Sequence, residues 1–147
     1  MIRENLAMPI FRTTRRVEFG DTDMAGIVHF SNFFRYMEAA ECEFLRTRGL
    51  SVLLNWEGLA IGFPRVSATC EYLAPACFED LLDIAVTIDC IGTKSVTYAF
   101  AFSRAGKPIA HGKVTSVCCR TGADDALEAC EIPASYRARL QSDTASA

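Results

Sequence analysis

Apolar residues follow a helical period in one part of the chain. Over residues 32–48 they recur at steps of four, three and four residues, which places them on one face of a helix: Phe33, Met37, Ala40 and Phe44. Ser31 or Asn32 is suited to cap the start of this helix, and Gly49 suits the position just past its end. The pattern therefore predicts one amphipathic helix with both ends marked.

The segments on either side of the helix follow a strand period. A strand is expected over 11–19, and a short helix or turn over 51–57. From Phe63 onward apolar and polar residues alternate, which predicts an antiparallel meander of four strands, over 66–72, 82–89, 94–104 and 109–119. A helix on one face of an antiparallel sheet is an α+β arrangement. Periodicity thus supports an α+β fold with one central helix.

Length and composition indicate one globular domain over residues 1–147, with an ordered core of about 9–140 and a frayed tail at 141–147. Half of the residues are apolar and 22% are charged. The net charge of −3 and the scattered basic residues argue against a nucleic-acid partner. No apolar run reaches the ~18 residues of a membrane span, and the N-terminus lacks a signal pattern. We expect a cytoplasmic protein without membrane insertion.

The chain holds seven cysteines, an odd number without a C-x-x-C pair. That pattern predicts neither a disulfide framework nor a zinc site. Cys70, Cys90 and Cys118 fall at strand positions where a reduced thiol acts as a small hydrophobe. We therefore expect reduced, mostly buried thiols, which fit a reducing compartment.

An acidic loop precedes the helix, in the stretch FGDTDMAGIVHFSN over residues 19–32. Asp21 is expected to form a turn or to cap the loop backbone. Asp21 and Asp23 together make a poor metal site, because a metal needs more ligands than two carboxylates supply. We expect no metal. Asp23 is either a second loop-stabilising carboxylate or a catalytic one.

Residues 17–33 resemble the signature of the 4-hydroxybenzoyl-CoA thioesterase family and of its Tol-Pal-associated branch. The shared features are D-x-D, two residues, Gly, two aliphatic residues, an aromatic or His pair, and Ser or Asn opening the helix. Residues 132–136 resemble the closing I-P-x-x-Y of that family, and the order of elements agrees over about 11–136.

This resemblance implies a hotdog fold, in which a five-stranded antiparallel sheet wraps around one long central helix. It implies a homodimer or dimer of dimers with active sites at subunit boundaries. The implied reaction is hydrolysis of an acyl-CoA substrate to the acid and free CoA. No cofactor is implied beyond the coenzyme A carried by the substrate.

Within the motif, the resemblance places the catalytic carboxylate on Asp23 and the oxyanion-binding backbone amide near Phe30. Thioester cleavage needs little acid assistance, because the leaving thiol has a pKa of about 8.5. It needs a base or nucleophile and a donor for the oxyanion, and the unpaired amides of a helix N-terminus can donate. Gly26 allows close approach of backbone. His29 either supports the site or is simply a satisfied histidine beside the loop.

The substrate-binding residues are less defined by the sequence. Aromatic and sulfur side chains at the helix start are candidates for the acyl pocket, although each also fits a core position: Phe30, Phe33, Phe34 and Met37. Glu41 either contacts the acyl pocket or belongs to a solvated face or subunit contact. Lys94 sits where relatives use a basic residue for the CoA phosphates, and Arg104, Lys107 and Arg120 are further candidates.

Two other functions stay open. A hotdog hydratase or dehydratase acts on the same thioesters, but dehydratases of fatty acid synthesis place Pro and Gly where Ser31 and Asn32 follow His29 and Phe30 here. A non-catalytic acyl-CoA binding protein has no need of a carboxylate such as Asp23 facing the thioester.

Overall fold

A computed structural model describes residues 10–142 of the chain. Residue 9 of the expected core and residues 143–147 of the expected tail lie outside the described residues. The elements are β1 (Phe11–Arg16), η1 (Phe19–Asp21), α1 (Asn32–Thr47), β2 (Leu53–Trp56), β3 (Leu59–Gly62), β4 (Arg65–Tyr72), β5 (Leu81–Ile91), β6 (Ser95–Arg104), β7 (Lys107–Val117), β8 (Cys119–Thr121), η2 (Ala123–Asp125), β9 (Leu127–Ala129) and α2 (Ala134–Leu140). Within residues 10–142, no helix is both long enough and apolar enough to cross a membrane.

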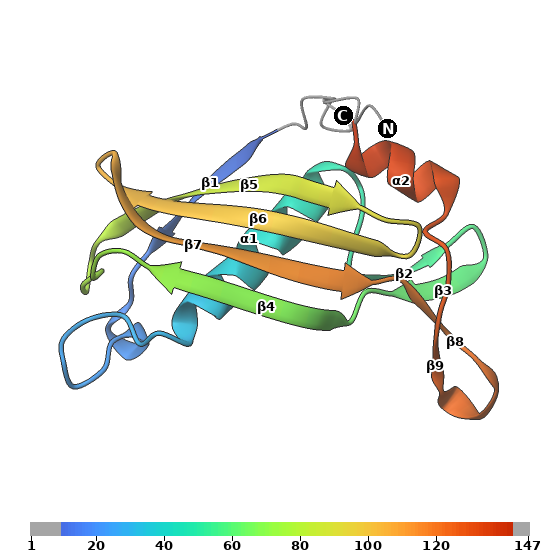
Figure 1. The fold of residues 1–147 in the computed structure, drawn as a ribbon, viewed down its shortest axis with the longest axis horizontal. Helices are drawn as coiled ribbons and strands as arrows, with labels where there is room; N and C mark the ends of the chain where they lie inside the picture. Colours follow the sequence, from blue (N-terminus) through green and yellow to red (C-terminus); the bar gives the residue numbers. More distant parts are fainter. Residues whose placement is uncertain (1–9, 143–147) are drawn as a thin grey trace.

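The fold is α+β, with a long antiparallel sheet in the order β1-β5-β6-β7-β4 and one main helix, α1, against its inner face (Figure 1). Strands β5, β6 and β7 form a meander as predicted. The predicted place of β4 in that meander is wrong, because β4 pairs with β7 at the far edge. The connection over 73–80 is longer than a tight hairpin allows, and it crosses the end of the sheet instead.

A second, small sheet has the order β2-β3-β8-β9. The predicted helix or turn over 51–57 is wrong, because β2 and β3 form a hairpin there. Its turn places Glu57 at φ 50° and Gly58 at φ 83°, the pair of positive angles that a tight two-residue hairpin requires. The predicted strand over 109–119 is divided, since β7 ends at Val117 and Cys119 begins β8. Helix α2 was not predicted from the sequence.

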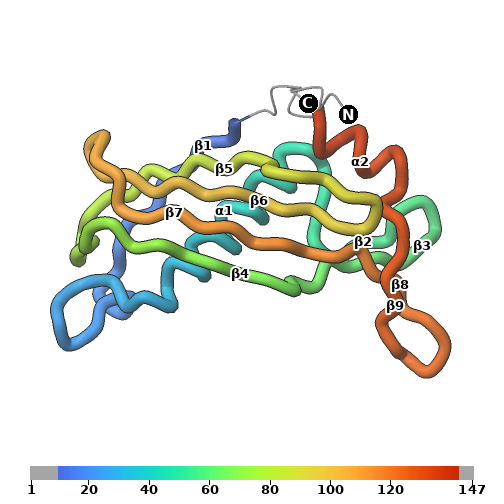
Figure 2. Tube along the Cα trace, viewed as in Figure 1, coloured from blue at the N-terminus to red at the C-terminus, as the bar shows by residue number. Residues whose placement is uncertain are grey.

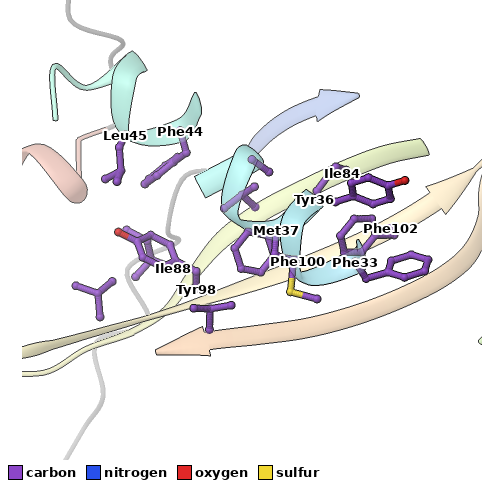
Figure 3. Close-up of a cluster of buried hydrophobic side chains, with 14 of the residues drawn as sticks. Phe33, Tyr36, Met37, Phe44, Leu45, Ile84, Ile88, Tyr98, Phe100 and Phe102 are labelled. Carbon is purple, nitrogen blue, oxygen red and sulfur yellow. The ribbon is translucent and has the colours of Figure 1, made fainter. Parts of the chain in front are cut away.

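The main core lies between α1 and the sheet. Figure 3 shows aromatic and aliphatic side chains of α1 facing those of β5 and β6, among them Phe33, Met37 and Phe44 from the helix and Ile84, Tyr98 and Phe100 from the strands. The helix face predicted from the spacing is thus the buried face: Phe33, Met37, Ala40 and Phe44 are all buried. Gly49 has φ +66° just past the helix end, as its predicted position requires.

The cysteines are less buried than predicted. All seven are free thiols, but only Cys118 and Cys119 are buried, whereas Cys77 and Cys90 are exposed. Cys90 leaves the inner face because the pairing of β5 with β6 shifts between Ile88 and Cys90. One extra residue in a strand turns the side chains after it to the opposite face of the sheet. The alternation over 82–89 therefore does not extend to Cys90.

Gly112 on β7 sets how closely the neighbouring elements pack. A Cβ at this position would lie 2.5 Å from the carbonyl oxygen of Thr69 and would also overlap the Met37 side chain. We expect Gly112→Ala to lower the free energy of unfolding by about 1–3 kcal/mol, because β4 and α1 must both move. Urea denaturation measures the change. Gly20→Ala is the control, since a Cβ there meets nothing within 4 Å, and an equal loss in both variants would contradict the packing argument.

Candidate active site

The acidic loop connects β1 to α1 at one end of the main sheet, where Figure 2 shows it as the blue segment beside the start of the helix. Two backbone hydrogen bonds attach it to the segment that follows β4. Val28 N–H donates to the carbonyl of Ala76 at 2.8 Å, and Val17 N–H donates to the carbonyl of Asp80 at 2.9 Å. The loop is therefore held between the helix start and the end of the sheet.

Asp21 organises this loop from within, as predicted for a turn-forming carboxylate. Its Oδ2 accepts hydrogen bonds from the Tyr36 hydroxyl at 2.8 Å and from Glu18 N–H at 3.0 Å. Its carbonyl oxygen accepts from His29 N–H at 2.9 Å and from Asn32 Nδ2 at 2.8 Å. Burial, followed by the hydrogen bond to Asp21, raises the pKa of the Tyr36 phenol well above its ordinary value. Tyr36 therefore stays a neutral donor.

Asp23 lies in a different environment, on the exposed side of the loop. Its Oδ1 accepts a hydrogen bond from Ala25 N–H at 2.8 Å, which forms a turn stabilised by the side chain. Gly26 N–H donates to the Asp23 carbonyl at 3.0 Å, and the φ of +79° at Gly26 is one that favours glycine. Among residues 10–142, no hydrogen bond engages Oδ2 of Asp23. One oxygen thus fixes the carboxylate and the other remains available.

The start of α1 offers a backbone donor beside this carboxylate. His29 N–H donates to Asp21 and Asn32 N–H donates to the carbonyl of His29, but the N–H of Phe30 donates to no other described residue. Ser31 precedes the helix as predicted, although its side chain does not cap the helix backbone. Instead Ser31 Oγ lies 2.7 Å from Nδ1 of His29.

His29 is turned toward this helix start. Its Nδ1 accepts a hydrogen bond from Ser31 N–H at 3.3 Å, and its ring contacts the ring of Phe30 with centroids 4.5 Å apart and planes tilted by 30°. These contacts engage His29 in holding the segment 29–31. A supporting role of His29 in catalysis stays a prediction.

A cavity of about 570 Å³ joins the loop to the end of β4, and its volume suits a small-molecule ligand. The lining contains three of the predicted site residues, Asp23, Phe30 and Phe33. It also contains residues that the sequence reasoning missed, namely Ile27, Val28, Tyr72, Leu73, Ala74, Pro75 and Ala76. The apolar run that ends β4 is the signal for this wall, but the sequence does not show that this run meets the loop, as it does where Val28 N–H donates to Ala76.

An ion pair stiffens the segment behind this wall. Arg104 Nη1 lies 2.6 Å from Asp80 Oδ2 and donates to the carbonyl of Pro75 at 3.2 Å. Asp80 Oδ2 also accepts from Cys77 N–H at 2.8 Å. The Cys77 N–H, and then Arg104, lower the pKa of the Asp80 carboxyl below its usual range. Of the predicted CoA-binding cations, Arg104 therefore lies at the loop end of the sheet, where it already has protein partners.

Several predicted substrate-binding residues lie outside this cavity. Met37 is fully buried in the core. Phe34 and Glu41 line a separate cavity of about 130 Å³ between α1 and β4. Lys94 follows β5 at the end of the sheet opposite the loop (Figure 1), and at ~3.3 Å per residue the length of β5 separates the two ends. Within one protomer the structure does not bring these four residues to Asp23, so their roles stay predictions.

Glu41 is a buried carboxylate with one strong partner. It is 1% exposed, and its Oε2 accepts from Arg65 Nη2 at 3.2 Å, while Oε1 has no partner among the described residues. Burial raises the pKa of Glu41 more than Arg65 lowers it. Arg65 reaches α1 because the pairing of β4 is irregular between Arg65 and Ser67. The pair connects the edge strand to the helix.

A second large cavity lies on the outer face of the sheet. It measures about 470 Å³ and is lined mainly by short side chains of β5, β6 and β7, with His111, Glu71 and Lys113 at its border. His111 Nε2 lies 3.3 Å from Glu71 Oε2, and both side chains are exposed at the surface. No residue of the acidic loop reaches this cavity. Asp23 and Phe30 therefore identify the inner cavity as the candidate active site.

The arrangement has the parts that an acyl-transfer site requires. A carboxylate oxygen is free to take a proton or to attack a carbonyl carbon. A backbone N–H at a helix start is free to stabilise an oxyanion, and the helix dipole favours negative charge there. Among residues 10–142, no group of three or more His, Cys, Asp or Glu side chains is placed to hold a metal ion.

Comparisons with known proteins agree with this chemistry. A profile described as the Thioesterase-like superfamily matches residues 17–140. The 1,4-dihydroxy-2-naphthoyl-CoA hydrolase of Synechococcus sp. strain RCC307 is 33% identical over 106 residues, which cover 69% of this chain and 81% of the relative.

Solved structures share the fold over nearly their whole length. A gentisyl-coenzyme A thioesterase is 34% identical with a TM-score of 0.74, covering 86% of this chain and 99% of its own. The 4-hydroxybenzoyl-CoA thioesterase from Pseudomonas sp. strain CBS-3 is 27% identical with a TM-score of 0.77, covering 89% of this chain and 99% of its own.

The two acids of the loop should differ in their effect on stability. Asp21→Ala leaves the buried Tyr36 hydroxyl without its acceptor, and we expect a loss of about 1–3 kcal/mol in the free energy of unfolding. Asp23→Ala removes one exposed turn contact, for which we expect a loss below about 1 kcal/mol. Denaturant unfolding of both variants measures the difference. A larger loss for Asp23→Ala would show that Asp23, and not Asp21, is the structural acid.

Proposed function

This chain belongs to the thioesterase-like superfamily and is an enzyme with acyl-CoA thioesterase activity, and we propose that Asp23 and the backbone N–H of Phe30 carry the hydrolysis. The products are the free acid and coenzyme A. The observation that carries this assignment is the shared cavity: a carboxylate with a free oxygen and a residue with an unused N–H line the same space.

In the general-base route, Asp23 takes a proton from water as the water oxygen attacks the thioester carbon. The carbonyl oxygen becomes an oxyanion and accepts a hydrogen bond from Phe30 N–H, a type of interaction whose loss typically costs about 2.7–4 kcal/mol. The tetrahedral intermediate then expels the CoA thiolate, which receives the proton from Asp23. In the nucleophilic route, an Asp23 oxygen attacks the same carbon, CoA leaves, and water hydrolyses the resulting anhydride.

We propose an aromatic acyl group as the preferred substrate. The rings of Phe30, Phe33 and Tyr72 line the cavity, and flat aromatic groups pack well against such rings. Three relatives are named for hydroxylated aromatic acyl groups: 1,4-dihydroxy-2-naphthoyl, gentisyl and 4-hydroxybenzoyl. We also propose that no metal or other cofactor takes part, that residues 1–147 form one domain, and that the protein works in the cytoplasm, where free thiols persist.

We further propose that the five strands wrap around α1 in the hotdog arrangement and that two copies join along β4. The two edges of the main sheet differ in character. The β1 edge carries Arg12, Arg15 and Arg16, and such charges discourage pairing with another strand. The β4 edge instead exposes apolar residues, including Val66 at 61% and Tyr72 at 46%. Such an edge favours a partner strand.

A two-fold dimer along β4 would bring opposite ends of the two sheets together, because the paired edge strands run antiparallel. The loop end of one protomer would then lie toward the Lys94 end of its partner. Lys94, too far from Asp23 within one protomer, would become available to the CoA phosphates from the second copy. This geometry supports the predicted location of the active sites at the subunit boundary.

Asp23→Asn should abolish most of the activity of a folded enzyme, because the amide neither takes a proton nor attacks. We expect kcat to fall by about a hundredfold or more. Hydrolysis of 4-hydroxybenzoyl-CoA and hexanoyl-CoA is followed by loss of thioester absorbance in buffer containing EDTA. A thiol reagent is unsuitable as the readout, since exposed Cys77 and Cys90 would react with it.

Asp21→Asn serves as the matched control, because its loss acts through loop structure and should reduce kcat less. Equal residual rates in the two variants would refute the role of Asp23. A third thioester, crotonyl-CoA, separates the hydratase function: a hydratase would lower its double-bond absorbance without releasing thiol. An acyl-CoA binding protein would bind both thioesters and leave them intact.

Val66→Lys should weaken the proposed dimer, because it places a charge among the apolar side chains of the interface, where an unpaired charge is costly to bury. We expect the wild-type protein to sediment as a dimer or a dimer of dimers, and the variant to shift toward the monomer with a loss of activity. Leu127→Lys on β9 is the control, as Leu127 is also an exposed apolar residue, at 64%. A monomeric wild type that is fully active would overturn the proposed dimer.

A further inference from the structure

Tyr72 makes a contact that the mechanism above does not use. It is the last residue of β4, and its hydroxyl donates a hydrogen bond to the carbonyl oxygen of Phe30 at 2.9 Å. Its ring meets the ring of Phe33 edge to face at 5.5 Å. The tyrosine thus connects the edge strand to the residue whose N–H is free.

The two peptide groups on either side of Phe30 have different hydrogen-bond partners. The carbonyl of His29 accepts from Asn32 N–H at 2.9 Å, and in a trans peptide the N–H of Phe30 points to the opposite side. The next peptide, between Phe30 and Ser31, has its carbonyl held by Tyr72. Phe30 itself is 62% exposed, so little packing restrains it. The hydroxyl of Tyr72 therefore supplies a restraint that the loop backbone does not.

The position of Tyr72 is itself well defined. Tyr72 pairs with Ala110 of β7, and the two residues after it, Leu73 and Ala74, both donate to the carbonyl of Ile109 at 2.9 and 3.1 Å. The end of β4 is thus attached to β7, a strand that is paired on both sides. The hydrogen bond from the Tyr72 hydroxyl therefore holds the start of α1 against a firmly paired part of the sheet.

We propose that Tyr72 is a positioning residue. Its hydroxyl holds the carbonyl of the Phe30–Ser31 peptide, and this fixes the far side of Phe30, so that the N–H of Phe30 in the preceding peptide stays directed at the substrate carbonyl. The inference rests on the proposed function, since it concerns the same oxyanion donor. A donor fixed in advance stabilises the transition state without reorganisation, whereas a mobile one must first be ordered. The loss of the hydroxyl should therefore act on kcat more than on substrate binding.

Tyr72→Phe is the test, because it removes only the hydroxyl and keeps the ring against Phe33. We expect kcat for 4-hydroxybenzoyl-CoA to fall about tenfold, a part of the loss that removing an oxyanion donor outright causes, with KM within about twofold of the wild type. Tyr136→Phe is the matched control. It removes a phenol that donates to the Ser51 carbonyl at 3.1 Å and should leave kcat unchanged.

A second measurement does not depend on turnover. We expect NMR relaxation to show added motion at the Phe30 amide in Tyr72→Phe and none in Tyr136→Phe. In the Asp23→Asn background, adding Tyr72→Phe should leave the affinity for 4-hydroxybenzoyl-CoA unchanged, since the oxyanion forms only during reaction.

The outcomes separate the two proposals. An active wild type with unaltered kcat and an unaltered Phe30 amide in Tyr72→Phe overturns the role of Tyr72 and leaves the thioesterase assignment intact. A rise in KM that accounts for the whole loss of kcat/KM also overturns it, because the hydroxyl would then act in binding. An inactive wild type whose Phe30 amide becomes mobile in Tyr72→Phe overturns the function, while the positioning contact stands.

Discussion

The hydrogen bonds of Asp21 are the constraint on which the site depends. Its carboxylate accepts from Tyr36 on the buried face of α1, and its carbonyl accepts from His29 and Asn32 at the helix start. These bonds join the acidic loop, the first turn of the helix and the core in one unit. Asp23 and Phe30, on either side of this junction, keep their relative positions because the junction does not move freely.

The two acids of the loop have the same side chain, but they lie in different environments. Asp21 directs its Oδ2 and its carbonyl to partners within the fold, and it does not line the cavity. Asp23 is exposed, engages one oxygen in a turn and keeps the other free. A reactive carboxylate needs this partial restraint, because a fully mobile group would have to be oriented in each turnover. The contacts of Asp21 thus hold the loop that carries Asp23, the proposed catalytic acid.

Predictions from local spacing were confirmed where the feature depends on residues within a single element. The steps of four and three residues through Phe33, Met37, Ala40 and Phe44 determine which side of α1 is buried, whatever it packs against. Gly49 ends the helix for a local conformational reason, and Asp21 stabilises its loop through neighbours in the chain. Asp23 and Phe30, which the family resemblance singled out, are separated by six residues and line one cavity. These features are properties of short segments.

Local patterns in the chain are thus sufficient for the helix, for most strands and for the acidic loop. Long-range packing was needed to learn that β4 pairs with β7, that residues 72–76 form the cavity wall, and that Lys94 lies at the far end of the sheet. It also decided that Cys90 is exposed, through a shift in pairing with β6. The reason is physical: a residue's spacing fixes its face within an element, but which distant segments meet depends on how all the faces are buried together.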